Sequence, residues 1–187
     1  MLIKEREIKG VFEIELEPQK DRRGFFMRTY DEMIFDKYKL QQKWVQENHS
    51  YAKIRGTIRG LHFQFPPFSE IKLVRVARGE VFAVFVDIRK GFSTFGQWGT
   101  VNLSEDNKKM LYIPKGFALG TCTLSDCCSM LYKMSDYYTP ESQGVIKWND
   151  PDLSIDWPVD NDPIISEKDE NAKSFKEFIA THGSIIV

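Results

Sequence analysis

The stretch that decides the fold is I-R-G-L-H-F-Q at Ile58–Gln64, which is followed by a proline pair and then by K-L-V-R-V-A-R-G-E-V at residues 72–81. Both runs have an extended character, because β-branched and other apolar residues dominate them and Pro66-Pro67 separates them. His62, one of 3 histidines in the chain, lies on the first run between an arginine and a lysine. An imidazole exchanges protons near neutral pH, and flanking basic residues favour an anionic ligand. His62 is therefore the leading candidate for a general base, the alternative being a half-buried strand histidine.

Short apolar or alternating runs recur along the rest of the chain, a pattern typical of an all-β sandwich or barrel. The expected strands cover residues 11–16, 44–51, 57–63, 71–78, 81–88, 98–103, 110–113, 119–124, 130–134 and 144–148. Gly79-Glu80 is expected to form a tight turn between two of them. Helical patterns cover residues 30–39 and a tail from 166 to about 181, where Ser166 can cap the helix and Asp169 can close a capping box.

Composition limits the class of protein. A chain of 187 residues is long enough for one domain, expected to span residues 1–187. The formal net charge of −1 argues against nucleic acid or an anionic membrane as a partner. No apolar run is long enough to span a membrane, and the N-terminus has no apolar signal region. Cys122, Cys127 and Cys128 are odd in number and lack zinc-site spacing, so we expect free thiols and a cytoplasmic location.

A β-rich class with a histidine on an early strand is the cupin, whose metal site takes two histidines and an acid from one strand pair and another histidine after P-x-G. In this chain Gln64 stands at the second strand position. The later motif is P-K-G-F-A-L at residues 114–119, with Leu119 in the histidine position. Because these imidazoles are missing, a first-row transition metal is not expected. Catalysis is expected to use side chains alone, with no metal and no cofactor.

Ordered motifs extend over most of the chain. They are R-G-F-F at 23–26, V-Q-E-N-H-S at 45–50, R-G-L-H-F-Q at 59–64, K-L-V-R-V-A-R-G-E-V from 72, V-D-I-R-K-G at 86–91, F-G-Q-W at 95–98, Y-I-P-K-G-F-A at 112–118, L-Y-K-M-S-D-Y-Y at 131–138, N-D-P-D-L-S-I-D-W-P at 149–158 and I-S-E-K-D at 165–169. Together they resemble the dTDP-4-dehydrorhamnose 3,5-epimerase family, a metal-free group that acts on nucleotide 4-keto sugars. The resemblance implies an all-β, cupin-like jelly-roll β-sandwich with short peripheral helices. It also implies a homodimer that exchanges N-terminal strands.

The resemblance assigns catalytic roles to four residues. His62 matches the family's base, Asp169 the carboxylate paired with it, Lys72 the cation near the 4-keto oxygen, and Tyr132 the proton donor on the opposite face. Hydrogens next to a ketone are weakly acidic, so their inversion requires a base, a donor on the other face and a cation at the developing enolate. Without the resemblance, Asp169 would be interpreted as a helix first-turn acid, Lys72 as a strand-surface lysine and Tyr132 as a core aromatic.

The same resemblance assigns the nucleotide half of the site. Two arginines match diphosphate-binding residues, a task that suits a bidentate guanidinium. Two aromatic residues match those that hold the base and sugar by stacking, and three polar residues occupy alternate positions of one strand and therefore one face. These residues are Arg23 and Arg59, Phe26 and Tyr138, and Gln46, Asn48 and Ser50.

Two positions depart from the family pattern. Leu119 stands where the family has a histidine in the sugar cavity, and Arg28 stands where the family has an acid at the nucleotide end. Thymine presents an N3–H donor that suits an acidic acceptor, whereas cytosine presents an acceptor that tolerates an arginine. Alternatively, Arg28 reaches a phosphate or solvent.

These observations favour one function and leave two alternatives. The favoured function is inversion of C3 and C5 of a nucleotide-activated 4-keto-6-deoxy sugar, as in dTDP-rhamnose and lipopolysaccharide biosynthesis. One alternative is a single-position epimerase, at C5 or C3, acting on a CDP-linked 4-keto deoxysugar. The other alternative is a non-catalytic cupin module that binds a nucleotide sugar, for which an aligned base and acid would be unnecessary.

Overall fold

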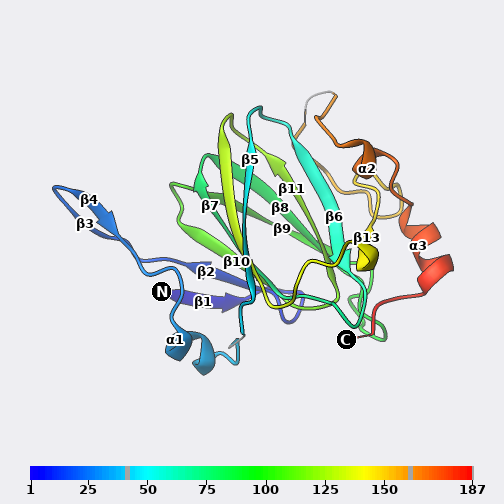
Figure 1. Cartoon of the computed structure of the whole chain (residues 1–187), viewed down its shortest axis with the longest axis horizontal. Helices are drawn as coiled ribbons and strands as arrows, with labels where there is room; N and C mark the ends of the chain where they lie inside the picture. Colours follow the sequence, from blue (N-terminus) through cyan, green and yellow to red (C-terminus); the bar gives the residue numbers. More distant parts are fainter. Residues whose placement is uncertain (41–42, 160–161, 187) are drawn as a thin grey trace.

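The computed structural model describes residues 1–40, 43–159 and 162–186, which form two facing antiparallel sheets with short helices at the periphery (Figure 1). The six-stranded sheet has the order β1 (Leu2–Glu5), β2 (Phe12–Glu15), β10 (Lys109–Ile113), β7 (Lys72–Arg78), β12 (Cys128–Met134) and β5 (Gln46–Ala52). The five-stranded sheet has the order β13 (Gln143–Val145), β6 (Ile58–Gln64), β11 (Phe117–Thr123), β8 (Glu80–Asp87) and β9 (Trp98–Ser104). The predicted all-β, cupin-like jelly-roll sandwich is confirmed.

The remaining elements lie outside these two sheets. The hairpin of β3 (Gln19–Asp21) and β4 (Gly24–Phe26) projects away from the body of the molecule (Figure 1). The helices are α1 (Glu32–Lys37), the 3₁₀ helix η1 (Pro140–Ser142), α2 (Glu167–Glu170) and α3 (Phe175–His182). In Figure 1, α2 and α3 lie on the side of β6 and β13, opposite the hairpin.

The core is divided by the alternation of side chains along each strand. On β11, Leu119 faces the space between the sheets, whereas Ala118 packs on the outer face beneath Phe175 and Phe178 of α3. A third cluster packs Phe35 of α1 against the six-stranded sheet. Burying one such large apolar side chain contributes about 1.5–3 kcal/mol. Apolar side chains fill part of the space between the sheets, and polar residues surround a cavity in another part.

The tight turn predicted at Gly79-Glu80 is present, but the strands that it joins do not pair with each other. Gly79 does turn the chain, with φ of +79°, between the end of β7 and the start of β8. However, β7 pairs with β10 and β12, whereas β8 pairs with β9 and β11. The turn therefore carries the chain from one sheet to the other. Tight local turns look alike in the sequence whether the strands that follow pair or diverge.

The predicted continuous helical tail is wrong. It is divided into α2 and α3, because Lys173 forms a bridge with Ile146 and Ser174 caps a new helix. Ser166 does cap α2 by accepting the Asp169 N–H, but the Asp169 carboxylate does not accept the Ser166 backbone N–H, so the capping box is incomplete. The complete capping box lies at Ser174 and Glu177.

The sequence patterns did not predict the exact bounds of several helices and strands, and they missed some short strands. The helix predicted over 30–39 is reduced to Glu32–Lys37, capped by Asp31, and the strand predicted over 144–148 is reduced to Gln143–Val145. Strands β1, β3 and β4 were not expected, because segments as short and charged as L-I-K-E and Q-K-D carry little apolar alternation. Pairing with β2 holds β1 in place, with Ile3 opposite Ile14.

Candidate active site

A cavity of about 340 Å³ lies between the two sheets. Its volume falls in the range of roughly 300–1,000 Å³ that is usual for small-molecule sites. Of the residues predicted for the site, it brings together Gln46, Asn48, Ser50, Arg59, His62, Lys72, Leu119, Tyr132 and Tyr138. Asp169 lies behind His62, out of contact with solvent.

One wall of the cavity comes from β5 and β12. Their antiparallel register places Gln46, Asn48 and Ser50 opposite Met134, Tyr132 and Met130, in that order, and all six side chains line the cavity. The Gln46 amide donates to the Asn48 side-chain oxygen at 3.0 Å, which orders the polar row. The alternation predicted for the three polar residues of β5 therefore places them on the cavity face.

The opposite wall depends on an irregularity in β6. His62 pairs with Leu119 and Arg59 with Thr121, so the four residues 59–62 on β6 match three residues, 119–121, on β11. This bulge lets Arg59 and His62 face the same cavity, although a regular strand would turn them to opposite faces. The extra residue is accommodated at Gly60, whose φ of +107° is accessible to glycine.

Asp169 from α2 orients His62. Its Oδ1 lies 2.6 Å from His62 Nε2, and its Oδ2 accepts the Gly60 backbone N–H at 3.1 Å. Burial by itself raises the pKa of the Asp169 carboxyl, but the hydrogen bonds and charge of His62 and the Gly60 N–H together hold that pKa below its usual range. An ionised carboxylate only accepts, so the hydrogen of the imidazole lies on Nε2. Nδ1 is then the ring nitrogen that can accept a proton.

Lys72, at the start of β7, is buried at the other sheet with two hydrogen-bond partners. Its Nζ donates to the His62 backbone oxygen at 3.2 Å and lies 2.6 Å from Glu70 Oε1. An ammonium has three N–H donors, so one donor remains for a ligand in the cavity.

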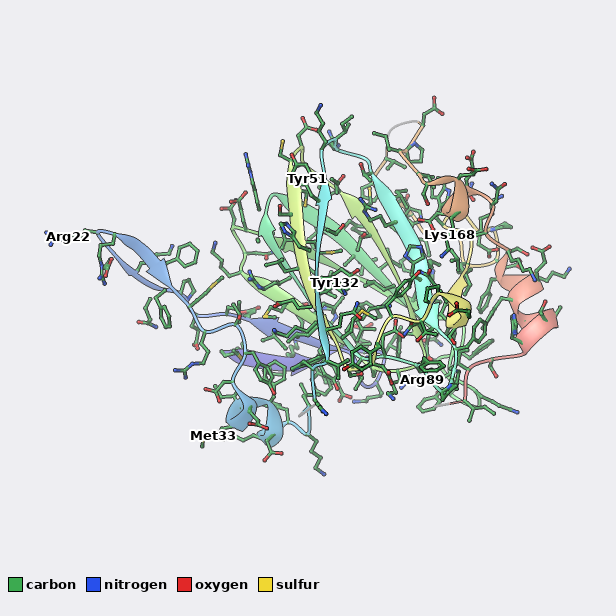
Figure 2. The ribbon with its side chains drawn as sticks, viewed as in Figure 1. Arg22, Met33, Tyr51, Arg89, Tyr132 and Lys168 are labelled. Carbon is green, nitrogen blue, oxygen red and sulfur yellow. The ribbon has the colours of Figure 1, made fainter. Side chains whose placement is uncertain are left out.

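Tyr132 extends from β12, in the sheet opposite to that of His62. Figure 2 shows it in the middle of the molecule, far from Arg22 at the tip of the hairpin. Burial raises the pKa of its phenol, and the negative charge of Glu70 adds to the rise while Arg59 opposes it. The phenol therefore stays protonated at neutral pH and can donate a proton.

Three predicted residues lie outside the cavity of their own chain, on or just after the β3–β4 hairpin. Arg23 forms an ion pair with Asp21, and the Phe26 ring is 72% exposed. Arg28 forms an ion pair with Asp31 at 2.9 Å. One chain alone therefore does not bring this group to the cavity.

Comparison with known proteins agrees with this geometry. The family model of dTDP-4-dehydrorhamnose 3,5-epimerase matches residues 5–177. The chain belongs to this family. The enzyme of that name from Methanothermobacter thermautotrophicus is 47% identical over 172 residues, which cover 91% of this chain and 92% of the relative. The chain is accordingly an epimerase, in the isomerase class.

Solved structures of family members superpose closely on the epimerase. The Legionella pneumophila enzyme, described in complex with dTDP-4-keto-L-rhamnose, has a TM-score of 0.92 and 40% identity, covering 100% of this chain and 98% of that one. A 3'-monoepimerase from Streptomyces bikiniensis, described in complex with dTDP-quinovose, has a TM-score of 0.91 and 27% identity, covering 97% of this chain and 92% of that one.

Some cavity residues of the epimerase were not predicted. They are Phe63, Gln64, Glu70, Thr121, Met130, Met134 and Gln143. A signal for two of them was present, because Met130 and Met134 lie two residues from Tyr132 on the same strand. Gln64, considered only as a missing metal ligand, donates to the backbone oxygens of Phe68 and Tyr137 at 2.8 and 3.1 Å. It therefore holds the loops at the end of the cavity.

Within residues 1–40, 43–159 and 162–186, no group of three or more His, Cys, Asp or Glu side chains could hold a metal ion. In the same part of the chain, no helix is long and apolar enough to cross a membrane.

The bulge at Gly60 gives a first prediction. A Cβ there would lie 2.4 Å from the Leu119 backbone oxygen and 2.9 Å from Gly120 Cα, and backbone atoms cannot move aside cheaply. Gly60→Ala should lower the free energy of unfolding by about 1–3 kcal/mol and reduce activity through the displaced Asp169 contact. Chemical denaturation and turnover check both effects. Gly56→Ala is the matched control, since φ is +78° there but nothing lies within 4 Å; equal losses in both variants would show that crowding is not the cause.

The buried carboxylate gives a second prediction. Asp169→Asn keeps the side-chain volume but turns an N–H group toward either His62 Nε2 or the Gly60 N–H, both of which donate to Asp169. We expect kcat to fall by about 10²- to 10⁴-fold. The Kd for nucleoside diphosphate should change little, as shown by calorimetry. The control is Glu170→Gln, which changes an exposed neighbour on α2 and should retain full activity. A normal kcat in Asp169→Asn would exclude a role of Asp169 in catalysis.

Proposed function

We propose that this epimerase inverts both C3 and C5 of a dTDP-linked 4-keto-6-deoxyhexose. One observation carries the proposal: the His62–Asp169 pair and the Tyr132 and Lys72 side chains face one cavity from different sheets. Inversion of a carbon next to a ketone requires a base and an acid on opposite faces of the sugar. The relative crystallised with dTDP-4-keto-L-rhamnose supports this substrate class.

The base in the proposed mechanism is Nδ1 of His62. It removes the hydrogen on a carbon next to the ketone, and the imidazole becomes an imidazolium. The Asp169 carboxylate, 2.6 Å from Nε2, stabilises the positive charge that develops on the ring. Because Asp169 is also fixed by Gly60 and Ser166, the ring is held ready for the transfer.

The developing negative charge falls on the 4-keto oxygen. The Lys72 ammonium, held by Glu70 and the His62 backbone oxygen, donates its remaining N–H to that oxygen. A preorganised cation in a site of low dielectric stabilises an enolate without reorganisation during the reaction. The Tyr132 phenol then delivers a proton from the opposite face, which inverts the carbon.

The nucleotide half of the site is proposed to be completed by a second copy of the chain. The β3–β4 hairpin projects from the body and exposes two aromatic rings, with Phe25 at 52% and Phe26 at 72% exposure (Figure 1). Arg23 and Arg28 lie on the same segment, so a homodimer that exchanges N-terminal strands would bring these groups to the partner's cavity. Arg59 and Tyr138 would contribute from the chain's own cavity.

The single-position alternative has one observation in its favour. Leu119 lies directly opposite His62 in the β6–β11 pairing and presents an apolar side chain beside the base. The similarity to a 3'-monoepimerase shows that this fold accommodates inversion of one carbon. The CDP preference suggested by Arg28 has less support, because Asp31 already binds its guanidinium. A non-catalytic binding module finds no support in the His62–Asp169 pair.

The proposed function is tested by deuterium incorporation. The enzyme is incubated in D₂O with dTDP- and CDP-linked 4-keto-6-deoxyglucose in parallel, and NMR assigns exchange and configuration at C3 and C5. We expect exchange and inversion at both carbons, with the higher kcat/KM for the dTDP-linked sugar. Exchange at one carbon alone would establish the single-position alternative. A preference for the CDP-linked sugar would show that the nucleobase of the substrate is cytosine and not thymine.

The cysteines support a cytoplasmic location. Cys122, Cys127 and Cys128 are unpaired. Burial raises the pKa of both Cys122 and Cys128 to about 11, so these thiols stay protonated. Free thiols are typical of a reducing compartment.

Independence from metal ions is a third prediction. Gln64 and Leu119 occupy the positions where cupins place imidazole ligands, and the Gln64 amide is already bound to the backbone at Phe68 and Tyr137. Prolonged treatment with EDTA followed by desalting should leave at least about nine-tenths of the activity. Loss of activity that zinc, manganese or iron restores would contradict the prediction.

A further inference from the structure

One carboxylate oxygen of a residue that lines the cavity has no role in the mechanism above. Glu70 lines the cavity with its residue only 7% exposed, and its Oε1 lies 2.6 Å from Lys72 Nζ. Its Oε2 is buried and has no hydrogen-bond partner among residues 1–40, 43–159 and 162–186. A buried acceptor without a donor is costly, so its presence in a folded protein requires an explanation, and a bound molecule that supplies the donor is one.

We propose that Glu70 Oε2 accepts a hydrogen bond from the C3 hydroxyl of the bound sugar, which makes Glu70 a specificity-determining residue. The inference rests on the proposed function, in which Lys72 faces the 4-keto oxygen. Glu70 and Lys72 form an ion pair at the cavity, so an acceptor stands beside a donor. An α-hydroxy ketone presents the complementary pair on adjacent carbons, since its ketone accepts and its hydroxyl donates. The ion pair therefore matches the C3–C4 portion of the substrate.

This pairing has a consequence for specificity. Leu119 forms an apolar wall beside His62, and an apolar wall discriminates weakly between sugars that differ by one hydroxyl. A buried acceptor discriminates strongly against an analogue that lacks the donor, because the acceptor is then left unpaired. Recognition of the C3 hydroxyl is thus assigned to Glu70, at the other sheet.

The test compares the binding of two unreactive ligands, dTDP-6-deoxyglucose and its 3-deoxy analogue, by isothermal titration calorimetry. The wild-type enzyme should bind the 3-hydroxy ligand about 10- to 100-fold more tightly. In Glu70→Met, which has similar volume and no acceptor, the ratio should fall to about 1. Glu70→Gln should give an intermediate ratio, because its one carbonyl oxygen is shared between Lys72 and the sugar. The ratio within one variant does not depend on the fraction of folded protein.

Two controls complete the test. Glu47→Gln removes the charge of a glutamate that pairs with Lys133 at 3.4 Å outside the cavity, and its ratio should equal that of the wild type. An equal ratio in Glu70→Met and the wild type would overturn the proposal and restrict Glu70 to holding Lys72. A wild-type enzyme that binds both ligands equally would also overturn it. Failure of the proposed function is detected separately, as absence of deuterium exchange with the 4-keto sugar.

Discussion

His62→Ala should lower kcat for exchange of the hydrogens at C3 and C5 by about 10²- to 10⁴-fold, the usual contribution of a positioned base. The Kd for dTDP should change little, because the nucleotide is assigned to Arg59, Tyr138 and the polar row of β5. The expectation follows from the geometry of the ring, whose Nε2 is bound to Asp169 and whose Nδ1 is the nitrogen able to accept a proton. Deuterium incorporation measured by NMR, with calorimetry for dTDP, gives both quantities.

His49→Ala is the matched control for this experiment. His49 lies on β5 with its side chain on the exposed face, away from the cavity that its neighbours Asn48 and Ser50 line. Its removal should leave exchange unchanged. Near-normal exchange in His62→Ala would show that another group is the base, whereas a large rise in the Kd for dTDP would show that His62 binds rather than reacts.

His62 was predictable as the base because its motif is local, but the orientation of its side chain toward the cavity was not. I-R-G-L-H-F-Q indicates an extended segment, and regular alternation would place Arg59 and His62 on opposite faces. Their convergence depends on the bulge at Gly60, which appears only in the pairing of β6 with β11. For Asp169 the local pattern was wrong for a similar reason, although the resemblance to the family indicated its pairing with His62. Its local pattern predicts a capping box, yet a long-range contact with His62 uses its carboxylate instead.

The nucleotide end of the site shows another limit of prediction from the sequence. The strands of the two large sheets are long enough to show apolar alternation, whereas β3 and β4 carry no buried residue and no such pattern. The resemblance to the family supplied Arg23 and Phe26 as site residues and implied an exchange of N-terminal strands, and the hairpin that carries these residues projects from the body of its own chain (Figure 1). Glu70 was missed because S-E-I-K resembles a polar loop until Lys72 is placed in the cavity.

Tyr132→Phe should separate abstraction of the proton from inversion of the carbon. In this variant His62 and Lys72 can still form the enolate, but the opposite face has no donor. The expected result is deuterium exchange with retained configuration that outruns epimerised product, with inversion slowed by about 10²-fold or more. Because burial raises the pKa of the Tyr132 phenol, the wild-type donor should persist to a higher pH than an exposed tyrosine would.

Tyr112→Phe is the control that distinguishes loss of a donor from loss of a buried hydroxyl. Tyr112 lies on β10 in a core cluster outside the cavity, and burial raises its pKa to about 12. Removing its hydroxyl can affect stability, but it should leave the ratio of inversion to exchange unchanged. If exchange and inversion fall in strict proportion in Tyr132→Phe, the phenol is not the dedicated donor. The proton on the second face must then arrive from water or from another side chain in the cavity.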